Sequence, residues 1–537
     1  MDISKTRRYV LSILSGTLLG LSFPFTGGLI PLIFIALVPL LFLEHYIFVK
    51  KYRPIKVFIH SFITFSVYNI ISTWWIWNAS VGGALMAFFL NALLMAVFFQ
   101  FFVWTKRYIG QKEGYVGLVI YWIAFEFFHY HWELSYPWLN FGNVFSTLPE
   151  IVQWYSYLGV LGGTLWILFI NMIAFKILAN VYFKKETWRI QTPIVWIFSI
   201  FILVPSLLSV WSYSSFEDEN NPLEVVVVQP NFEAYTEKFT VPVSKQINKI
   251  VALADEKVTA KTAFVLAPET AIRNYNFSSI DEDEFFYTGI YDNLIAATQN
   301  WGNAALYIGA STHRFFDKPY SSASKLSRNG KWYESYNSSL VISENNNSGF
   351  VHKSALVLGV EKVPFARWFP FLEDLALSNG GTDGTLGVEK NGPKVITSKG
   401  ITFAPVVCYE SLYGDFIATQ CRQGAEAIFI VTNDGWWKDT PGYKQHLAFA
   451  QLRAVENRRW VARSANTGSS AFISPRGEIV QKTDYNVEAA LKQTIQLNSN
   501  LTFYATYGDW IGRSFGFVTM LMLVFTFVKY FRREKKF

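Results

Sequence analysis

The chain has few cysteines, few histidines and few charged residues for its length. Among 537 residues there are two cysteines and seven histidines, and 16% of the residues are charged. Two cysteines exclude a fold held by several disulfides, and no group of His, Cys and Asp has the spacing of zinc ligands, so we expect no metal. With 51% hydrophobic and 18% aromatic residues, this low charge also excludes an ordinary soluble protein.

Long apolar segments predict a membrane protein. About 20 apolar residues cross a bilayer as a helix, and eight segments approach that length. They lie at residues 9–25, 28–48, 57–77, 83–105, 115–132, 155–182, 192–211 and 510–530. The first is short and the last contains Arg513. The predicted fold class is therefore an α-helical membrane bundle of eight transmembrane helices that carries a further domain.

Lysine and arginine concentrate in alternate loops between these segments. They follow the second, fourth and sixth segments and occupy both ends of the chain, whereas the connections 26–27, 78–82 and 133–154 contain neither. Positive loops remain in the cytoplasm, so we expect both termini there; in a bacterium the membrane would be the inner one. The net charge of +7 lies mainly in these loops and indicates topology, with no nucleic-acid partner.

Residues 212–508 form a long hydrophilic insertion between the seventh and eighth segments. We therefore divide the chain into residues 1–211 with helices one to seven, a periplasmic domain at 212–508, and residues 509–537 with helix eight and a basic tail. Short β-branched runs in the insertion alternate with helical patterns, which is typical of an α/β domain with buried strands. The expected strands are 224–229, 263–268, 306–309, 339–343, 401–407, 427–432, 460–463 and 470–473, and the expected helices are 243–260, 285–300, 411–424 and 444–457.

Three reactive side chains follow predicted strands of this domain. Cys408 follows 401–407, Glu269 follows 263–268, and Lys353 follows 339–343 after a short turn. A thiol with a pKa of ~8.5 is mostly protonated at neutral pH, so a nucleophilic cysteine needs a base or a neighbouring cation. Glu269 can act as the base, and Lys353 can stabilise an oxyanion. Taken alone, each has an ordinary interpretation as a core thiol, a turn carboxylate or a surface charge, but the joint arrangement favours a nucleophilic site.

The remaining cysteine and the histidines of the domain exclude other arrangements. His313, His352 and His446 lie in no familiar Cys–His pattern, which disfavours a papain-like site. Cys421 follows Cys408 by 13 residues, inside the predicted helix 411–424. A rise of ~1.5 Å per residue separates the two by more than the ~7 Å that a disulfide spans. We predict two free thiols, with Cys421 in the core.

The Glu, Lys and Cys motifs, in this order, resemble the nitrilase or carbon–nitrogen hydrolase superfamily. Leu266–Thr270, Val407–Glu410 and Val431–Trp437 are similar to its signatures. The resemblance implies an α-β-β-α sandwich in which Glu269 is the general base, Lys353 the oxyanion-stabilising lysine and Cys408 the nucleophile. It also implies supporting roles for Glu361, Tyr409 and Glu410.

The order of the chain, with seven apolar segments before such a domain and one after it, resembles that of the apolipoprotein N-acyltransferase family. Residues 136–142, 445–456 and 463–468 are also similar to this family. This resemblance implies that Cys408 takes an acyl chain from a membrane phospholipid and passes it to the α-amine of an apolipoprotein's N-terminal diacylglyceryl-cysteine. No cofactor is required, because a thioester stores the reactivity of the acyl group. The alternatives are a membrane-tethered amidase that uses water, a non-enzymatic assembly protein and, least favoured, a transporter.

Several positions near the expected site concern lipid contact or structural support. The run Leu358–Glu361 departs from the Pro-Phe-Gly-Glu of the family, and a tryptophan expected after the first strand is absent. We expect Tyr235 or Phe239 to replace it against acyl chains. The apolar segment 367–377, with Trp368 and Phe371, is predicted to gate the site toward lipid, ordinary packing being the alternative. Glu126, in the fifth segment, is predicted to hydrogen-bond the 133–154 loop.

Overall fold

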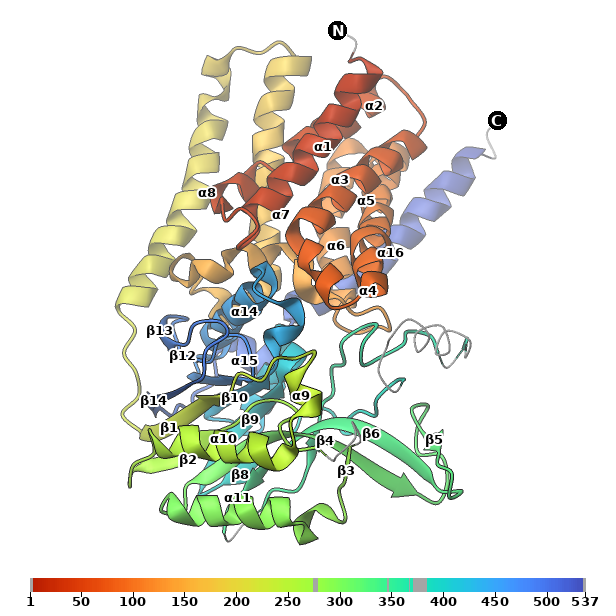
Figure 1. The fold of residues 1–537 in the computed structure, drawn as a ribbon. Helices are drawn as coiled ribbons and strands as arrows, with labels where there is room; N and C mark the ends of the chain where they lie inside the picture. Colours follow the sequence, from red (N-terminus) through yellow and green to blue (C-terminus); the bar gives the residue numbers. More distant parts are fainter. Residues whose placement is uncertain (1–2, 274–278, 345–346, 367, 370–383, 535–537) are drawn as a thin grey trace. The chain divides into compact units, whose positions relative to one another are not determined.

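The computed structural model describes residues 3–273, 279–344, 347–366, 368–369 and 384–534, without the side chains of Phe239, Arg533 and Glu534. The chain divides into two compact units, shown as a ribbon in Figure 1. The helical unit comprises residues 1–77, 81–215 and 509–537, and the α/β unit comprises residues 78–80 and 216–508.

Each of the eight predicted segments coincides with helical structure. The helices are α1 (Lys5–Ser22), η1 (Ile30–Phe34) with α2 (Val38–Val49), α3 (Ile55–Thr73), α4 (Val81–Leu85) with η3 (Met86–Leu90) and α5 (Asn91–Tyr108), α6 (Gln111–Phe128), α7 (Tyr155–Phe183), α8 (Trp188–Ser214) and α16 (Trp510–Glu534). In the described ranges, six of these segments are long and apolar enough to cross a membrane. The two that fall short, α1 and α6, each carry three charged residues, and their crossing remains a prediction.

Glu126 has the structural role that the sequence suggested. Its carboxylate, in α6, accepts hydrogen bonds from the backbone N–H of Phe141 at 2.8 Å and from the hydroxyl of Thr164 at 2.6 Å. The indole of Trp122 donates a third bond at 3.1 Å. The predicted link between the fifth segment and the 133–154 loop is confirmed, and a buried carboxylate with three donors is well satisfied.

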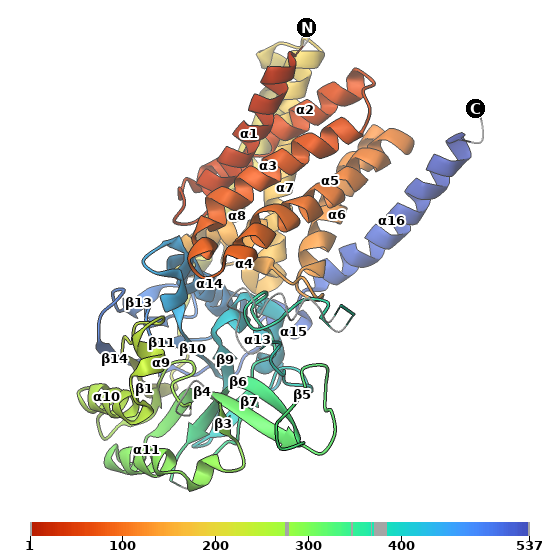
Figure 2. The same ribbon diagram turned by 45° about the vertical axis from the view of Figure 1, so that its right-hand side comes forward.

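The α/β unit contains two sheets, which Figure 2 shows from a second side. In the described part of the chain, the first sheet has the order β14-β1-β2-β4-β6-β5, with β3 on β4 and β7 on β6. Its strands are β1 (Pro222–Gln229), β2 (Thr262–Leu266), β3 (Ile280–Asp281), β4 (Ala305–Phe316), β5 (Lys325–Leu326), β6 (Trp332–Ile342), β7 (Val351–His352) and β14 (Ala489–Gln496). Strands β1, β2 and β4 are parallel, whereas β14 and β6 pair antiparallel at either side of them.

The second sheet has the order β13-β12-β11-β10-β9-β8. Its strands are β8 (Ile396–Ser398), β9 (Ile401–Val407), β10 (Ala427–Thr432), β11 (Val461–Ala465), β12 (Ala471–Ile473) and β13 (Ile479–Lys482). The central strands β9, β10 and β11 are parallel, and all the residues of β10 and β11 are buried. The prediction of strands buried on both faces is confirmed here.

Among the described residues, three separate hydrophobic cores define the layers of the unit. Alternate residues of β1, such as Val226, pack under α10 (Val243–Asp255) and α11 (Gly289–Asn300). Their neighbours, such as Val227, face Phe403 and Phe429 of the second sheet. The outer face of that sheet packs under α13 (Gly414–Arg422) and α14 (Pro441–Asn457), in a core that includes Cys421. Since strand residues alternate between faces, this is an α-β-β-α sandwich, as predicted.

The expectation of two free thiols is also confirmed. Cys408 and Cys421 are both free and buried. Cys421 lies in α13, and its side chain is 2% exposed.

Candidate active site

Glu269, Lys353 and Cys408 lie just beyond strands that belong to the two facing sheets. Glu269 comes three residues after β2, Lys353 directly follows β7, and Cys408 begins η9 (Cys408–Leu412) directly after β9. The three residues are 5%, 1% and 7% exposed, respectively. A carboxylate, an ammonium and a thiol are thus removed from bulk water, where each strongly affects the protonation of the others.

The ammonium of Lys353 is held by two carboxylates. Its Nζ lies 2.9 Å from Glu361 and 3.5 Å from Oε1 of Glu269. Burial alone would lower the pKa of Lys353, but the charges of Glu361 and Glu269 raise it above its ordinary value. Lys353 therefore remains a cation at any pH at which the protein works, which suits it to stabilise a negative charge on a substrate.

Asn337, in the middle of β6, connects the two carboxylates. Its Nδ2 donates hydrogen bonds to Oε1 of Glu269 at 2.7 Å and to Oε1 of Glu361 at 2.8 Å. One amide thereby orients both partners of Lys353. Sequence reasoning missed this residue, because the predicted strand began at Ser339 and a single Asn in an alternating strand carries no chemical signature.

Glu361 reaches the site in spite of the unusual sequence before it. The backbone N–H of Glu361 donates to the carbonyl of Val357 at 2.9 Å, and Gly359 adopts a φ of +79°. Oε2 of Glu361 in turn accepts from the N–H of Val357 at 2.8 Å. The Leu358–Glu361 departure from the family pattern therefore leaves the carboxylate against Lys353.

Cys408 occupies an unfavourable backbone conformation at the end of β9. Its φ is +50°, a left-handed conformation that costs of the order of 1–3 kcal/mol for a residue with a side chain. Burial raises the pKa of the Cys408 thiol and the charge of Glu269 raises it further, whereas Lys353 and a hydrogen bond with Thr432 lower it. The thiol is therefore protonated at rest and requires a base at the moment of attack, and Glu269 is the adjacent carboxylate.

Glu410 and Tyr409, which follow the cysteine, are both buried. The Glu410 carboxylate accepts hydrogen bonds from the backbone N–H of Ser354 at 2.5 Å and of Val407 at 2.8 Å. Burial raises the pKa of Glu410 to about 7, although these two hydrogen bonds oppose the shift. The ring of Tyr409 packs edge-on against Tyr413, with centroids 5.8 Å apart. Glu410 thus supports the backbone beside both Lys353 and Cys408.

A buried polar chain lies behind the turn at Cys408. Nε2 of His446 lies 2.9 Å from the hydroxyl of Ser411 and 3.2 Å from the carbonyl oxygen of Cys408. Its Nδ1 lies 2.9 Å from Asp434, which accepts a 2.7 Å hydrogen bond from Arg463. Burial alone would raise the pKa of Asp434, but Arg463 and His446 hold it below its ordinary value. The sequence motifs contain Asp434, His446 and Arg463, but only the fold shows that they act on one turn.

Of the residues predicted to contact lipid, the structure describes the side chains of Tyr235 and Trp368, and both are exposed. Tyr235 is 43% exposed, and its hydroxyl donates to the carbonyl of Trp436 at 2.7 Å. Trp368 is 72% exposed. Phe371 and the side chain of Phe239 lie outside the described residues. The lipid contacts and the gate remain predictions.

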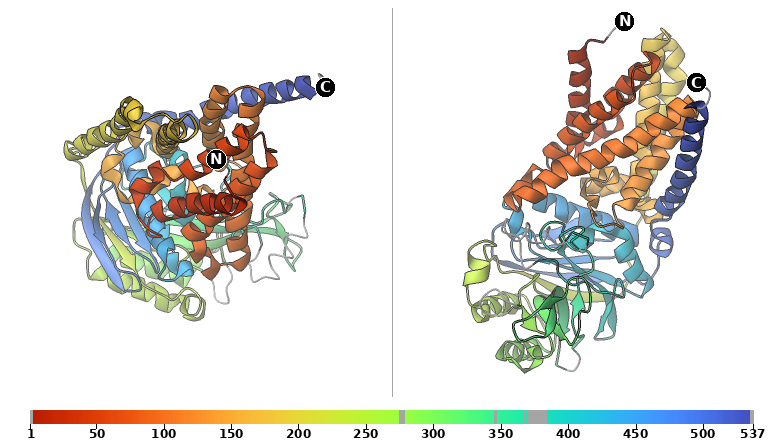
Figure 3. Two further views of the ribbon diagram at one scale, coloured as in Figure 1. Left: turned by 90° about the horizontal axis from the view of Figure 1, so that it is seen from above. Right: turned by 90° about the vertical axis from the view of Figure 1, so that its right-hand side faces the viewer.

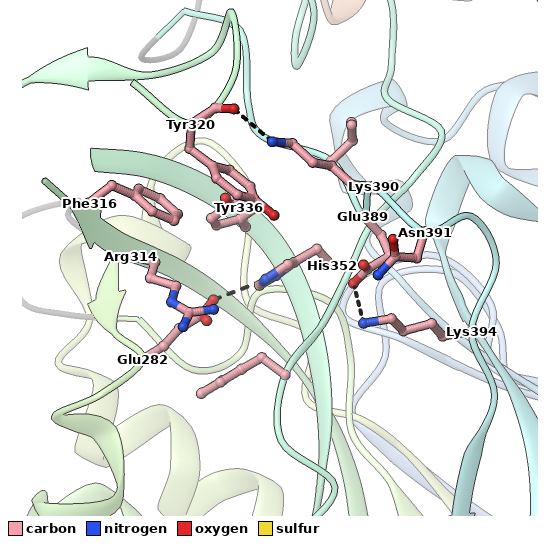
Figure 4. Close-up of a pocket in the computed structure, with 12 residues that line it drawn as sticks. Glu282, Arg314, Phe316, Tyr320, Tyr336, His352, Glu389, Lys390, Asn391 and Lys394 are labelled. Carbon is pink, nitrogen blue, oxygen red and sulfur yellow. Dashed lines mark hydrogen bonds and ion pairs between the residues drawn. The ribbon is translucent and has the colours of Figure 1, made fainter. Parts of the chain in front are cut away.

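A cavity of about 520 Å³ lies within the same unit, and Figure 4 shows its lining. Its lining includes Glu282, Arg314, Tyr320, Tyr336, His352 and Lys394. The rings of Tyr336 and His352 stack with their centroids 3.9 Å apart. In sequence, Tyr336 directly precedes Asn337 and His352 directly precedes Lys353. Because successive residues of a strand point to opposite faces, the cavity lies on the far side of β6 and β7 from Lys353. It is therefore separate from the thiol.

Comparisons with known proteins find similar families and relatives over nearly the whole chain. Residues 15–173 match the family described as the apolipoprotein N-acyltransferase N-terminal domain, and residues 225–500 match the carbon–nitrogen hydrolase family. The apolipoprotein N-acyltransferase of Chlorobaculum tepidum is 28% identical over 514 residues, which cover 94% of this chain and 93% of that protein. The apolipoprotein N-acyltransferase of Geobacter metallireducens is 26% identical over 535 residues, with 95% and 93% covered. Among solved structures, the nitrilase-superfamily protein Nit3 of Saccharomyces cerevisiae is 17% identical, with a TM-score of 0.34. The match covers 51% of this chain and 90% of Nit3.

Proposed function

We propose a reaction for this chain, which belongs to the carbon–nitrogen hydrolase family and, within it, to the apolipoprotein N-acyltransferases. The chain is an acyltransferase that acts on lipoproteins. In the proposed reaction an acyl chain moves from a membrane phospholipid, through a thioester on Cys408, to the α-amine of an apolipoprotein's N-terminal diacylglyceryl-cysteine. The observation that carries this assignment is the buried contact of Lys353 with Glu269 and Glu361 beside the Cys408 thiol.

The first half-reaction forms the thioester. Glu269 accepts the proton of the Cys408 thiol, and the sulfur attacks the ester carbonyl carbon of the phospholipid. The carbonyl oxygen becomes an oxyanion, which the ammonium of Lys353 stabilises. The ester C–O bond then breaks, Glu269 returns its proton to the leaving oxygen, and a lysophospholipid departs.

The second half-reaction is aminolysis of that thioester. The acceptor amine attacks the thioester carbonyl, again forming an oxyanion beside Lys353. The attacking nitrogen gives a proton to Glu269, the C–S bond breaks to leave the amide, and Glu269 passes that proton to the Cys408 sulfur. Glu361 and Asn337 act by holding Lys353 and Glu269 in place, because their hydrogen bonds fix both groups.

The membrane helices and the lipid substrates fit one topology. In the proposed topology both termini lie in the cytoplasm of a bacterial inner membrane and residues 216–508 face the periplasm. Two observations support it: Lys and Arg occupy alternate loops, and the start of α1 and the end of α16 lie at the same end of the helical unit, as Figure 3 shows. If the chain crosses the membrane an even number of times, its N- and C-termini must lie on the same side.

The test is an acyl adduct measured by intact mass. Purified protein in detergent is incubated with phospholipid alone, beside Cys408→Ser and the matched control Cys421→Ala. We expect one acyl chain on the wild type and on Cys421→Ala, none on Cys408→Ser, and discharge by a diacylglyceryl-cysteine peptide. Free fatty acid as the main product in the presence of that peptide would instead favour the amidase-like alternative, in which water is the acceptor.

A further inference from the structure

A second buried lysine lies beside Glu269. Lys238 belongs to the short helix α9 (Glu237–Thr240), and its side chain is 3% exposed. Its Nζ donates a hydrogen bond to the carbonyl oxygen of Glu269 at 3.2 Å. Sequence reasoning noted that a tryptophan is absent after the first strand and assigned Lys238 no role.

The backbone around Lys238 is fixed from two other elements. Its carbonyl oxygen accepts a hydrogen bond at 2.9 Å from Nε2 of Gln246, in α10. Arg273, which follows β2 and the Glu269 turn, donates to the same carbonyl oxygen. Lys238 is therefore held at the catalytic turn by the fold, and is not a surface side chain that happens to fold inward.

The environments of the two lysines differ in a way that matters for proton transfer. Lys353 contacts two carboxylates and stays charged, whereas Lys238 contacts a neutral carbonyl. Burial lowers the pKa of Lys238 to about 8; the Arg273 charge lowers it too, and the charge of Glu269 opposes the shift. A lysine in this range exchanges its proton near neutral pH, as a general base must.

The proton balance of aminolysis requires a second base. At pH 7 most of the acceptor arrives as an ammonium, because an α-amine has an ordinary pKa of ~7.7–8.0, and an ammonium must lose two protons to become an amide nitrogen. Glu269 can take one of them, which it returns to the Cys408 sulfur. The other proton leaves before the attack, because an ammonium has no lone pair, and needs an acceptor that Glu269 does not supply.

We propose that Lys238 is this second base, a role that rests on the proposed acyl transfer and deepens it. Neutral Lys238 takes a proton from the acceptor ammonium and so frees the amine. The amine nitrogen then bonds to the thioester carbon, the C–S bond breaks, and the remaining nitrogen proton passes through Glu269 to the thiolate. Lys238 finally releases its proton to water, so that each turnover delivers one proton to the solvent.

The test measures the two half-reactions separately in the full-length protein. Lys238→Met is compared with the wild type and with Lys245→Met, an exposed lysine of α10. Acyl loading from phospholipid is followed by intact mass, and discharge by a diacylglyceryl-cysteine peptide is timed from pH 7 to pH 9. Hydroxylamine, which is largely uncharged at neutral pH, serves as an acceptor that needs no prior deprotonation.

We expect Lys238→Met to load at the wild-type rate but to discharge to the peptide about 10-fold more slowly at pH 7, because only about a tenth of an amine with a pKa of ~8 is neutral at that pH. The deficit should shrink toward pH 9, where the peptide amine is already neutral, and should be absent with hydroxylamine. Lys238→Arg should not restore the rate, because arginine keeps its proton. Lys245→Met should match the wild type throughout.

Three results would overturn this role. The first is peptide discharge at the wild-type rate in Lys238→Met. The second is an equal loss of loading and discharge in that variant, and the third is rescue by Lys238→Arg; either of these would indicate a structural or purely electrostatic function. The proposed function fails in a different way: a wild-type protein that forms no acyl adduct would refute the thioester route itself, and the role of Lys238 with it.

Discussion

The carboxylate of Glu410 accepts a 2.5 Å hydrogen bond from the backbone N–H of Ser354, the residue after Lys353. The same carboxylate accepts from Val407, the residue before Cys408. One side chain therefore joins the two segments that present the ammonium and the thiol, although they are more than 50 residues apart in sequence. Its protonation and its removal should both have measurable effects.

The stability of the α/β unit should fall with pH through the titration of Glu410. Burial raises its pKa from an ordinary value of 4.5 to about 7. Between these values the unfolded chain has lost the proton while the folded protein keeps it, so the free energy of unfolding decreases as pH rises. At ~1.4 kcal/mol per pKa unit the loss is about 3 kcal/mol, complete by about pH 7.

Glu410→Gln has no such titration, so the difference in unfolding free energy between wild type and this variant should decrease from pH 4.5 to 7 and be flat above. Denaturant unfolding in detergent at several pH values measures it. A difference that grows over this interval would mean that the carboxylate is ionised in the folded protein at pH 5.

Asn337→Ala should reduce acyl loading by about 10²-fold while the protein stays folded. The substitution removes the amide that donates to Glu269 at 2.7 Å and to Glu361 at 2.8 Å, so the general base loses its orientation. The measurement is the rate of acyl adduct formation from phospholipid. Asn329→Ala, at an exposed turn before β6, is the control and should load normally. Full loading by Asn337→Ala would show that Lys353 alone orients Glu269.

Gly309→Ala should displace Glu269. A Cβ at position 309 would lie 2.5 Å from the Cα of Glu269 and 2.9 Å from the carbonyl oxygen of Pro268, so the backbone of the catalytic turn must move. A shift of this kind commonly costs about 10²-fold in rate. Gly289→Ala is the matched control, because no atom lies within 4 Å of its added Cβ. Equal loading rates of the two variants would refute the tight contact between β4 and this turn.

Trp368→Ser should slow loading from phospholipid and leave folding intact, if the apolar segment gates the site toward lipid. Trp368 is 72% exposed, so its removal leaves no cavity in the core. Loading from phospholipid in detergent is compared with that of Tyr287→Ser, an aromatic residue that is 89% exposed elsewhere on the unit. Unchanged loading by Trp368→Ser would end the gate hypothesis for this residue.

The central strands could be predicted from the sequence because their burial is symmetrical. Residues 401–407 and 427–432 are apolar on both faces, and β9 and β10 have those bounds. By contrast, β14 (Ala489–Gln496) mixes Lys and Gln with apolar residues and was missed, and β4 and β6 extend well beyond the predicted 306–309 and 339–343. Edge strands and hairpin arms bury one face only, so their sequences carry a weaker signal.

Some residues of the candidate site could likewise be identified from the sequence, and others could not. Glu269, Lys353 and Cys408 stand out because they follow predicted strands, and the family resemblance adds Glu361. In the structure Lys353 contacts both carboxylates beside the thiol. Asn337 and Lys238 could not be identified, because their proximity to Glu269 arises from pairing between β4 and β6 and from the docking of α9. Such contacts between distant segments have no local sequence signature.

The pairing of β1 with β14 determines how such a domain can be inserted into a membrane protein. These are the first and last strands of the α/β unit, and they pair antiparallel from Pro222 with Gln496 to Gln229 with Ala489. The points where the polypeptide enters and leaves the domain are therefore side by side. Residues 215–509 separate α8 from α16 in the sequence. Because the folded domain brings its own two ends together, the entropy cost of connecting these helices is that of a short loop.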